Sequence, residues 1–376
     1  MRQLRSILAT LVLLISGLAP VRAQELLEES LRIPMPEAGS RGLEAFMVRP
    51  NDSGAHPLAL ITHGTPREGA RRSETSALTF VPQAREFARR GWTTVIVVRR
   101  GYGTSGGSYA EEGRPCSLHP DYYDVGKESA KDLRFSIVYL SRIPQVDASH
   151  ILSVGISAGG FANVALTANP PPGLVAAISF AGGRGSRRPD EVCNPDDLVR
   201  TFGQFGKTSR VPMLWVYAEN DHFFGPQVAA RFYQAFTRSG GNAEFIRAAA
   251  FRRDGHGLFS PGGIPLWTPM VDEFLAGQNL KLRETLLALP VAPDVPPPSA
   301  LSAPGRLEWR NFLTYPEHRA FAVSGGGHYA YVYGRSTDKE ARMLALEHCK
   351  EGAPRGDRCE LVEDQATAVG DRSAPR

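Results

Sequence analysis

The sequence lacks the features that would place it across a membrane, on a nucleic acid or around a metal ion. Its longest apolar run falls short of the roughly 20 residues that span a bilayer. The four cysteines have no zinc-binding spacing, and no His-Glu-x-x-His motif is present. There is also no basic stripe and no nucleic-acid-reading motif. We therefore expect no metal, no cofactor, no nucleic-acid partner and no stable membrane span in the mature chain.

The first 23 residues differ from the rest of the chain. Arg2 and Arg5 precede a mostly apolar run over 7–18, and Val21 and Ala23 occupy the positions that signal peptidase reads. This pattern predicts a secretory signal cleaved near Ala23, with an uncleaved anchor as the alternative. Cleavage would remove three arginines and leave 40 basic residues against 39 acidic ones. We expect a periplasmic or secreted protein of nearly balanced charge.

Apolar runs alternate with helical patterns over residues 24–288. After a hairpin within 24–50, continuous apolar runs typical of doubly buried strands lie at 57–62, 92–98, 151–156, 174–180, 211–217 and 243–249. Amphipathic or helical segments lie at 76–90, 121–140, 161–168, 227–238 and 267–288. This alternation predicts an α/β fold, with a mainly parallel sheet flanked by helices and ligands bound at the carboxyl ends of its strands.

A second unit is predicted after the proline-rich linker 289–305. Residues 306–366 read as a small ββαβ module: two strands flank Gly325–Gly327, a capping box at Thr337 opens a helix, and a strand starts at Cys359. Residues 367–376 are expected to be a disordered tail. The module either binds an unidentified partner or packs on the larger domain.

An even number of cysteines in an exported chain predicts disulfides. Cys349 and Cys359 are close in sequence and are expected to join the helix of the small module to its last strand. Cys116 and Cys193 fall in loops on the carboxyl side of the predicted sheet. We predict that they pair and attach residues 184–210, interpreted as a small lid or rim, to the preceding glycine-rich loop.

The stretch around Ser157 has the pattern of a nucleophile elbow. Gly155-Ile-Ser-Ala-Gly159 follows an apolar strand and precedes a helical segment, which is the context that the motif requires. A chance match is the alternative in a chain with 38 glycines. Ser105 also lies in a Gly-x-Ser-x-Gly sequence, but no clean helix follows it, so we interpret it as a loop residue.

A serine nucleophile needs a base and an acid that orients the base. His256, in the loop after the last strand, is the predicted base. Asp221, after the strand 211–217, is the predicted acid, with Glu219 as its competitor. Asp254 is too close to His256 in sequence to orient it. Among the other histidines, His63 is expected to shape a neighbouring loop, and His222 to lie at the rim.

The oxyanion formed during acyl transfer needs two backbone donors. Ala158, directly after the nucleophile, is one candidate. The other should come from His63-Gly-Thr-Pro66, where the proline has no N–H, so Thr65 or Gly64 must donate. Thr65 is preferred.

These motifs resemble the α/β-hydrolase superfamily and, within it, the dienelactone-hydrolase and prolyl-oligopeptidase-like branch of serine hydrolases. The matching segments are His63–Pro66, Arg100–Gly106, Gly155–Gly160, Asn220–Asp221 and Gly255–His256. The order serine, aspartate, histidine is that of the superfamily. Two differences from that branch stand out: dienelactone hydrolases use a cysteine where Ser157 stands, and the chain has no room for the propeller of the oligopeptidases.

The resemblance and the residues together predict an exported serine hydrolase that cleaves a carboxylic ester or related acyl bond of a small molecule through an acyl-enzyme. A peptidase of the same mechanism is one alternative. A non-catalytic binding protein on a hydrolase scaffold is the other. Charged residues within 184–210, including Arg184, Arg187 and Arg188, are compatible with a charged substrate, but surface solubility explains them equally well.

Overall fold

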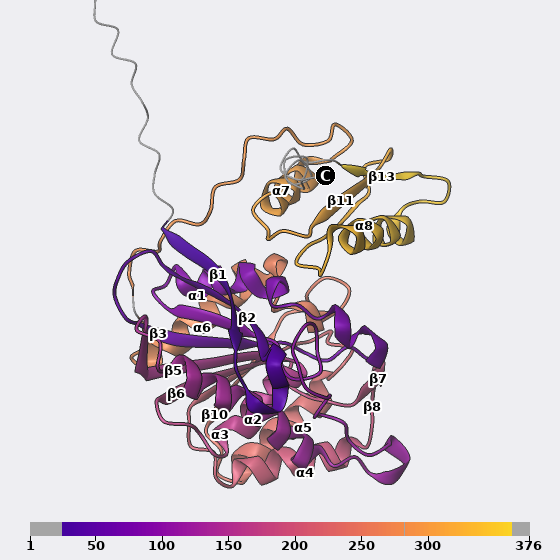
Figure 1. Cartoon of the computed structure of the whole chain (residues 1–376). Coiled ribbons are helices and arrows are strands. Elements are labelled where there is room, and N and C mark those ends of the chain that lie inside the picture. Colours follow the sequence, from indigo (N-terminus) through magenta and orange to yellow (C-terminus); the bar gives the residue numbers. More distant parts are fainter. Residues whose placement is uncertain (1–24, 282, 363–376) are drawn as a thin grey trace, which may run out of the picture.

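The computed structural model describes residues 25–281 and 283–362 (Figure 1). The predicted signal segment and the predicted C-terminal tail lie outside these residues. An eight-stranded sheet has the order β1-β2-β4-β3-β5-β6-β9-β10. Its strands are β1 (Leu26–Ile33), β2 (Leu43–Pro50), β3 (His56–Thr62), β4 (Thr93–Val97), β5 (Val146–Ile156), β6 (Leu174–Phe180), β9 (Met213–Ala218) and β10 (Ala243–Ala248).

The sheet is parallel except at one edge. The first hairpin, β1–β2, is antiparallel, and β2 also pairs antiparallel with β4. From β4 to β10 every pairing is parallel, so the carboxyl ends of six strands meet at one edge. The central runs expected to be doubly buried are buried, and all five residues of β4 and all six of β9 are. The run at 243–249 is an exception, because β10 is an edge strand in which only Ala248 is buried. These features confirm the predicted fold class.

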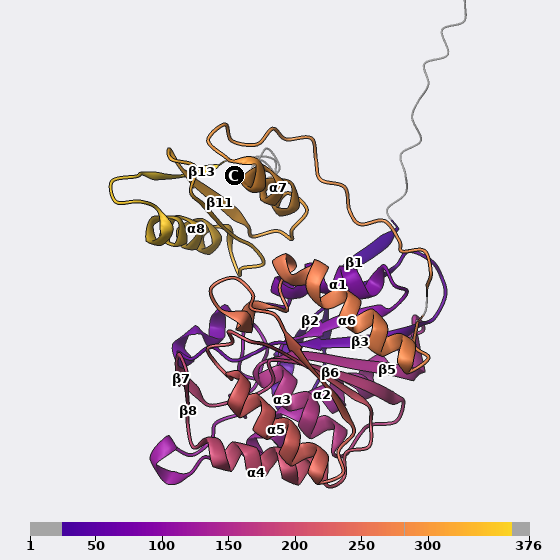
Figure 2. The ribbon, with the colours of Figure 1, turned by 180° about the vertical axis from the view of Figure 1, so that it is seen from behind.

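Helices cover both faces of the sheet (Figures 1 and 2). One face packs against α2 (Tyr122–Leu140), α3 (Ala158–Thr167), α4 (Pro195–Gly206) and α5 (Pro226–Arg238). The other packs against α1 (Val81–Ala88) and α6 (Ile264–Gly277). Each interface is a continuous apolar cluster, so the sheet has a core on each side.

The predicted helix over 267–288 was too long. The helix α6 ends at Gly277, because Asn279 adopts a left-handed conformation with φ 58°. The amide of Leu280 then donates to the Leu275 carbonyl, which closes the helix end. The apolar residues that extended the sequence pattern, such as Leu287, instead belong to an extended segment. In it the Leu287 amide donates to the carbonyl of Arg89, the residue directly after α1.

The segment 184–210 is only partly a rim. Its first part forms a two-stranded hairpin, β7 (Ser186–Arg188) and β8 (Glu191–Val192). Its second part is α4, which buries Leu198, Phe202 and Phe205 in the main core. The prediction of a lid over the whole segment was therefore wrong: the apolar stripe of α4 makes residues 195–206 a core helix.

The C-terminal unit has one more helix than the predicted ββαβ arrangement. It comprises α7 (Ala303–Phe312), β11 (Ala320–Ser324), β12 (Tyr329–Val332), α8 (Asp338–Gly352) and β13 (Cys359–Val362). The sheet order is β12-β11-β13, and both pairings are antiparallel. The extra helix α7 begins inside the predicted linker, with Ser302 as its cap, and buries Trp309.

The C-terminal unit packs on the domain of the eight-stranded sheet, on the side of α1 (Figure 2). The guanidinium of Arg85 donates to the Thr314 carbonyl at 2.5 Å, and the Tyr333 hydroxyl donates to the Thr79 carbonyl at 3.2 Å. Arg335 lines a cavity of about 270 Å³ together with Gly64. The unit therefore reaches the loop that contains the predicted oxyanion donor.

Within the described ranges, none of the helices is long and apolar enough to cross a membrane.

Candidate active site

Ser157 lies at a sharp turn between β5 and α3. Its backbone has φ 56° and ψ −122°, a conformation rare for a residue with a side chain. Two close approaches impose this turn. A Cβ on Gly155 would lie 2.4 Å from the Gly159 backbone, and one on Gly159 would lie 2.6 Å from the Thr62 carbonyl oxygen. Only glycine fits at either position, which is the physical basis of the Gly-x-Ser-x-Gly pattern.

The structure brings His256 and Asp221 together. The Nδ1 atom of His256 lies 3.2 and 3.1 Å from the two carboxylate oxygens of Asp221. His256 lies in a short turn after β10, and Asp221 follows β9. Because β9 and β10 are neighbours in the sheet, the two side chains lie close together. An Nδ1–H donated to Asp221 leaves Nε2 as the atom that can accept a proton.

The carboxylate of Asp221 is held in its ionised form. The residue is only 1% exposed, and its Oδ1 accepts hydrogen bonds from the Phe223 and Phe224 amides at 2.7 and 2.9 Å. Burial raises the pKa of Asp221, but the hydrogen bond with His256 and the two amides outweigh burial and lower it. An ionised, buried acceptor stabilises an imidazolium on His256.

The two competing acids have other positions. Glu219 is exposed, and its backbone amide bonds to the Ala248 carbonyl across the sheet. Asp254 accepts hydrogen bonds from the backbone amides of His256 and His222. It therefore shapes the turn that holds His256 rather than orienting the imidazole ring.

Ser157 and His256 line one cavity of about 480 Å³, together with Gly64, Thr65 and Phe223. Ser157 also opens on a larger cavity of about 520 Å³. Within the described residues, no hydrogen bond joins the Ser157 hydroxyl to His256. Such contacts are often long before substrate binds and shorten in the complex.

A stack of three side chains beside the site was not predicted from sequence. The ring of Phe223 lies parallel to the His256 imidazole at 3.8 Å, and the guanidinium of Arg67 covers its other face at 3.5 Å. Phe223 thus fixes His256 through its ring and Asp221 through its amide. The only sequence signal was an aromatic residue two positions after the acid.

The loop after β3 lies directly against Ser157. A Cβ on Gly64 would lie 3.0 Å from the Ser157 Cβ atom. Thr65 is fixed by a 2.6 Å hydrogen bond between its hydroxyl and that of Tyr102. Ala158 begins α3 and lines the larger cavity with Thr65. Both predicted oxyanion donors therefore border the space in front of Ser157.

His63 supports this loop from beneath. It is 2% exposed, its Nδ1–H donates to the Gly64 carbonyl at 2.6 Å, and its Nε2 accepts from the Arg99 amide at 3.0 Å. Burial, reinforced by the charge of Arg99, lowers the pKa of His63 to about 3. The residue is a neutral structural histidine, in agreement with the expected loop-shaping role.

The low pKa of His63 predicts acid sensitivity. The pKa of His63 is about 6.5 in the unfolded chain and about 3 in the folded one, so between these pH values His63 is protonated only in the unfolded chain. Stability should therefore fall as the pH falls through this window, by up to about 1.4 kcal/mol per pH unit from this residue. Urea unfolding at pH 7, 6 and 5 would measure this change in the free energy of unfolding. A His63→Asn variant should show a flatter profile, and an unchanged slope would contradict the assignment.

A buried ionic network lies under the larger cavity. Glu111 is 3% exposed and is bonded by Arg99, by Arg184 at 2.7 Å and by the Tyr102 hydroxyl at 2.9 Å. Burial raises the pKa of Glu111, but the two arginines outweigh it and hold the pKa far below its usual range. Arg184, predicted to be a surface or substrate-facing charge, is instead committed to this network.

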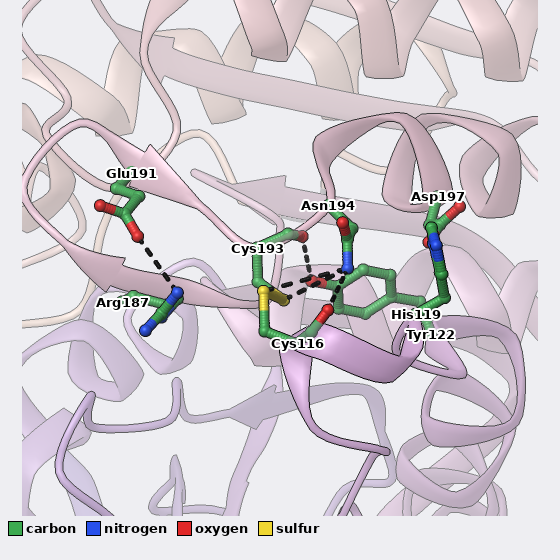
Figure 3. The surroundings of a disulfide bond; sticks show 8 residues. All are labelled: Cys116, His119, Tyr122, Arg187, Glu191, Cys193, Asn194 and Asp197. Atoms are coloured by element: carbon green, nitrogen blue, oxygen red, sulfur yellow. Dashed lines mark hydrogen bonds and ion pairs between the residues drawn. A yellow bond between two sulfur atoms is a disulfide. The ribbon is translucent and has the colours of Figure 1, made fainter.

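A disulfide between Cys116 and Cys193 closes the rim of the larger cavity (Figure 3). Asn194 donates to the Cys116 carbonyl at 2.6 Å, and the Tyr122 hydroxyl donates to the Cys193 carbonyl at 2.5 Å. The second disulfide joins Cys349 on α8 to Cys359 on β13. The structure contains both pairs that the sequence predicted.

Removing the rim disulfide is expected to affect stability and substrate binding together. Joint Cys116→Ser and Cys193→Ser replacement frees a loop whose ends are 77 residues apart, at a cost of about 2–4 kcal/mol. KM should rise because both loops line the cavity. Joint Cys349→Ser and Cys359→Ser replacement is the matched control and should leave KM unchanged. If the rim variant keeps both its KM and its unfolding free energy, the disulfide has no role at the site.

The remaining sequence candidates lie away from the reacting atoms. The Ser105 hydroxyl donates to the Val98 carbonyl and accepts from the Glu44 amide, so it is a buried loop residue, as interpreted. His222 bonds to Asp190 at 2.9 Å, and this contact raises its pKa. Over residues 25–281 and 283–362, no group of three or more histidine, cysteine or acidic side chains could hold a metal ion.

Comparison with known proteins gives a family match that covers less than half of the chain. Residues 39–201 match the model of the X-Pro dipeptidyl-peptidase family, S15. No curated protein matches the chain.

Solved structures with a similar fold include three hydrolases. Esterase 2 from Thermogutta terrifontis, phosphorylated by paraoxon, is 17% identical with a TM-score of 0.49, covering 68% of this chain and 96% of that one. A Klebsiella pneumoniae protein assigned as a dienelactone hydrolase is 17% identical with a TM-score of 0.45, covering 66% and 98%. The acylaminoacyl peptidase of Pyrococcus horikoshii is 17% identical with a TM-score of 0.49, covering 73% and 44%. These similarities carry no information about substrate.

Proposed function

We propose that this protein is an exported serine hydrolase of the α/β-hydrolase superfamily that cleaves carboxylic esters or related acyl bonds of small molecules. The observation that carries the proposal is the contact between the buried Asp221 and the partly buried His256, whose side chain lines the same cavity as Ser157 at its strained turn. The two disulfides support export, since such bonds persist in oxidising compartments.

The residues suggest a two-step reaction. His256 Nε2 takes the proton of the Ser157 hydroxyl as its oxygen attacks the acyl carbon. The amides of Ala158 and Thr65 stabilise the charge on the carbonyl oxygen. His256 then gives the proton to the departing alkoxide, and the acyl group stays on Ser157. Water, deprotonated by His256, attacks this ester, and His256 then returns the proton to the Ser157 oxygen as the carboxylic acid leaves, which regenerates the Ser157 hydroxyl.

Peptide cleavage by the same residues is the second candidate, and the family match over residues 39–201 favours it. Panels of para-nitrophenyl esters and of X-Pro anilides would separate the two. We expect turnover of esters with a kcat/KM well above that of the anilides. Faster anilide cleavage would make the protein a peptidase. Lack of turnover in both panels, from a folded protein, would favour a binding protein.

A further inference from the structure

The larger cavity beside Ser157 has an excess of positive charge. Its volume of about 520 Å³ suits a small organic ligand. Five arginines and two glutamates line it: Arg67, Arg72, Arg114, Arg184, Arg187, Glu111 and Glu112. An arginine can bind an anionic ligand strongly only if its guanidinium is not already paired with a carboxylate of the protein.

Three of the five arginines already have acidic partners. Arg184 bonds to Glu111 at 2.7 Å within the buried network. The two exposed arginines of the rim form weaker pairs, Arg187 with Glu191 at 3.4 Å and Arg114 with Asp121 at 3.5 Å. Each of these three arginines therefore already has a carboxylate of the protein beside it, although only the Arg184 pair is buried.

Arg72 and Arg67 have no acidic partner among the described residues. Arg72 is half-buried, and its guanidinium lies over the ring of Tyr109 at 4.0 Å. Arg67 lies over Phe223 and donates to the Ser186 hydroxyl and the His222 carbonyl, both neutral acceptors. An aromatic ring holds one face of each guanidinium. The edge N–H groups of Arg72 remain free to bind a planar acceptor such as a carboxylate.

We propose that this cavity binds a carboxylate of the substrate and that Arg72 is the residue that determines this specificity, with Arg67 adding charge. The inference rests on the proposed hydrolysis at Ser157. It narrows the substrates to acyl compounds that carry a second, anionic group on either side of the scissile bond. The smaller cavity, which includes Phe80, Ile156 and His256, then takes the other half of the substrate.

This charge pattern runs against the activity named in the family match. An enzyme that releases N-terminal dipeptides must hold a free amino group, which is a cation. Glu112 is the only lining acid without a basic partner in the part of the chain that the structure describes, and it is exposed. The unpaired arginines would repel an ammonium group and so oppose any attraction to Glu112.

Paired substrates of equal shape would test the proposal. On the acyl side, mono-para-nitrophenyl adipate is compared with para-nitrophenyl hexanoate. On the leaving-group side, para-acetoxybenzoate is compared with its methyl ester. The measured quantity is the ratio of kcat/KM for the anionic ester to that for the neutral ester, in the wild type and in Arg72→Met. Arg187→Met is the matched control, since it removes the same charge from the same cavity at a residue paired with Glu191.

In at least one pair, Arg72→Met should lower the ratio by about tenfold or more, the range of a charged hydrogen bond, with little change for the neutral ester. The loss should be mainly in KM, Arg72→Lys should restore part of it, and Arg187→Met should keep the ratio. A ratio unchanged by Arg72→Met in both pairs would overturn the proposal. Failure of the proposed function itself would differ, since the neutral esters would then not react in any variant.

Discussion

Replacing Ser157 with alanine is expected to lower kcat for ester hydrolysis by about a million-fold, down to the rate that binding and the oxyanion donors alone sustain. The hydroxyl is the atom that attacks, and no other serine of the described site can take its place. KM should change little because the hydroxyl contributes little to ground-state binding. Initial rates with a para-nitrophenyl ester, on protein shown to be folded by circular dichroism, measure the effect.

His256→Ala should cost about as much as Ser157→Ala, and the double variant no more than either single one. Residues that act as a unit show this non-additive behaviour. Two losses that add on a logarithmic scale would mean that the residues work independently. That result would contradict the proton transfer between them.

Asp221→Asn is expected to lower kcat by about 10⁴, because the amide no longer holds the imidazole in the productive tautomer or balances its charge. Glu219→Gln provides the matched control. It removes a carboxylate two residues away, at a side chain that is exposed in the structure. Rates should therefore remain near those of the wild type.

If Glu219→Gln were inactive and Asp221→Asn active, Glu219 rather than Asp221 would be the acid that orients His256. It would also contradict the contact of 3.1 Å between His256 Nδ1 and Asp221. Similar partial losses in both variants would mean that the two carboxylates share the role, which the single buried pair in the structure does not support.

The fold was largely predictable because its central strands are buried on both faces. Such strands appear as continuous apolar runs, and β4 and β9 consist entirely of buried residues. The elbow at Ser157 was also legible, since backbone contacts that exclude any side chain force glycine at 155 and 159. Both patterns are visible within a short stretch of residues, so one sequence suffices to recognise them.

Features that depend on contacts between distant loops were not predictable. Glu111 and Arg99 lie in the loop after β4, and Arg184 lies in the loop after β6, so the three meet only once the sheet has formed. The sequence suggested Arg184 as a possible substrate contact, whereas Arg72 has the unpaired guanidinium in the cavity. The predicted length of α6 and the predicted lid were wrong for a related reason. Tertiary packing, rather than sequence periodicity, determines where α6 ends and where α4 lies.

The most direct test of the account is labelling of the whole protein with a fluorophosphonate probe, followed by peptide mapping. The account predicts one labelled residue, Ser157, with labelling lost in His256→Ala and strongly slowed in Asp221→Asn. Covalent modification needs an activated serine but no knowledge of the natural substrate. Label on another serine, or no label on the folded protein, would contradict the proposal that Ser157 is the nucleophile.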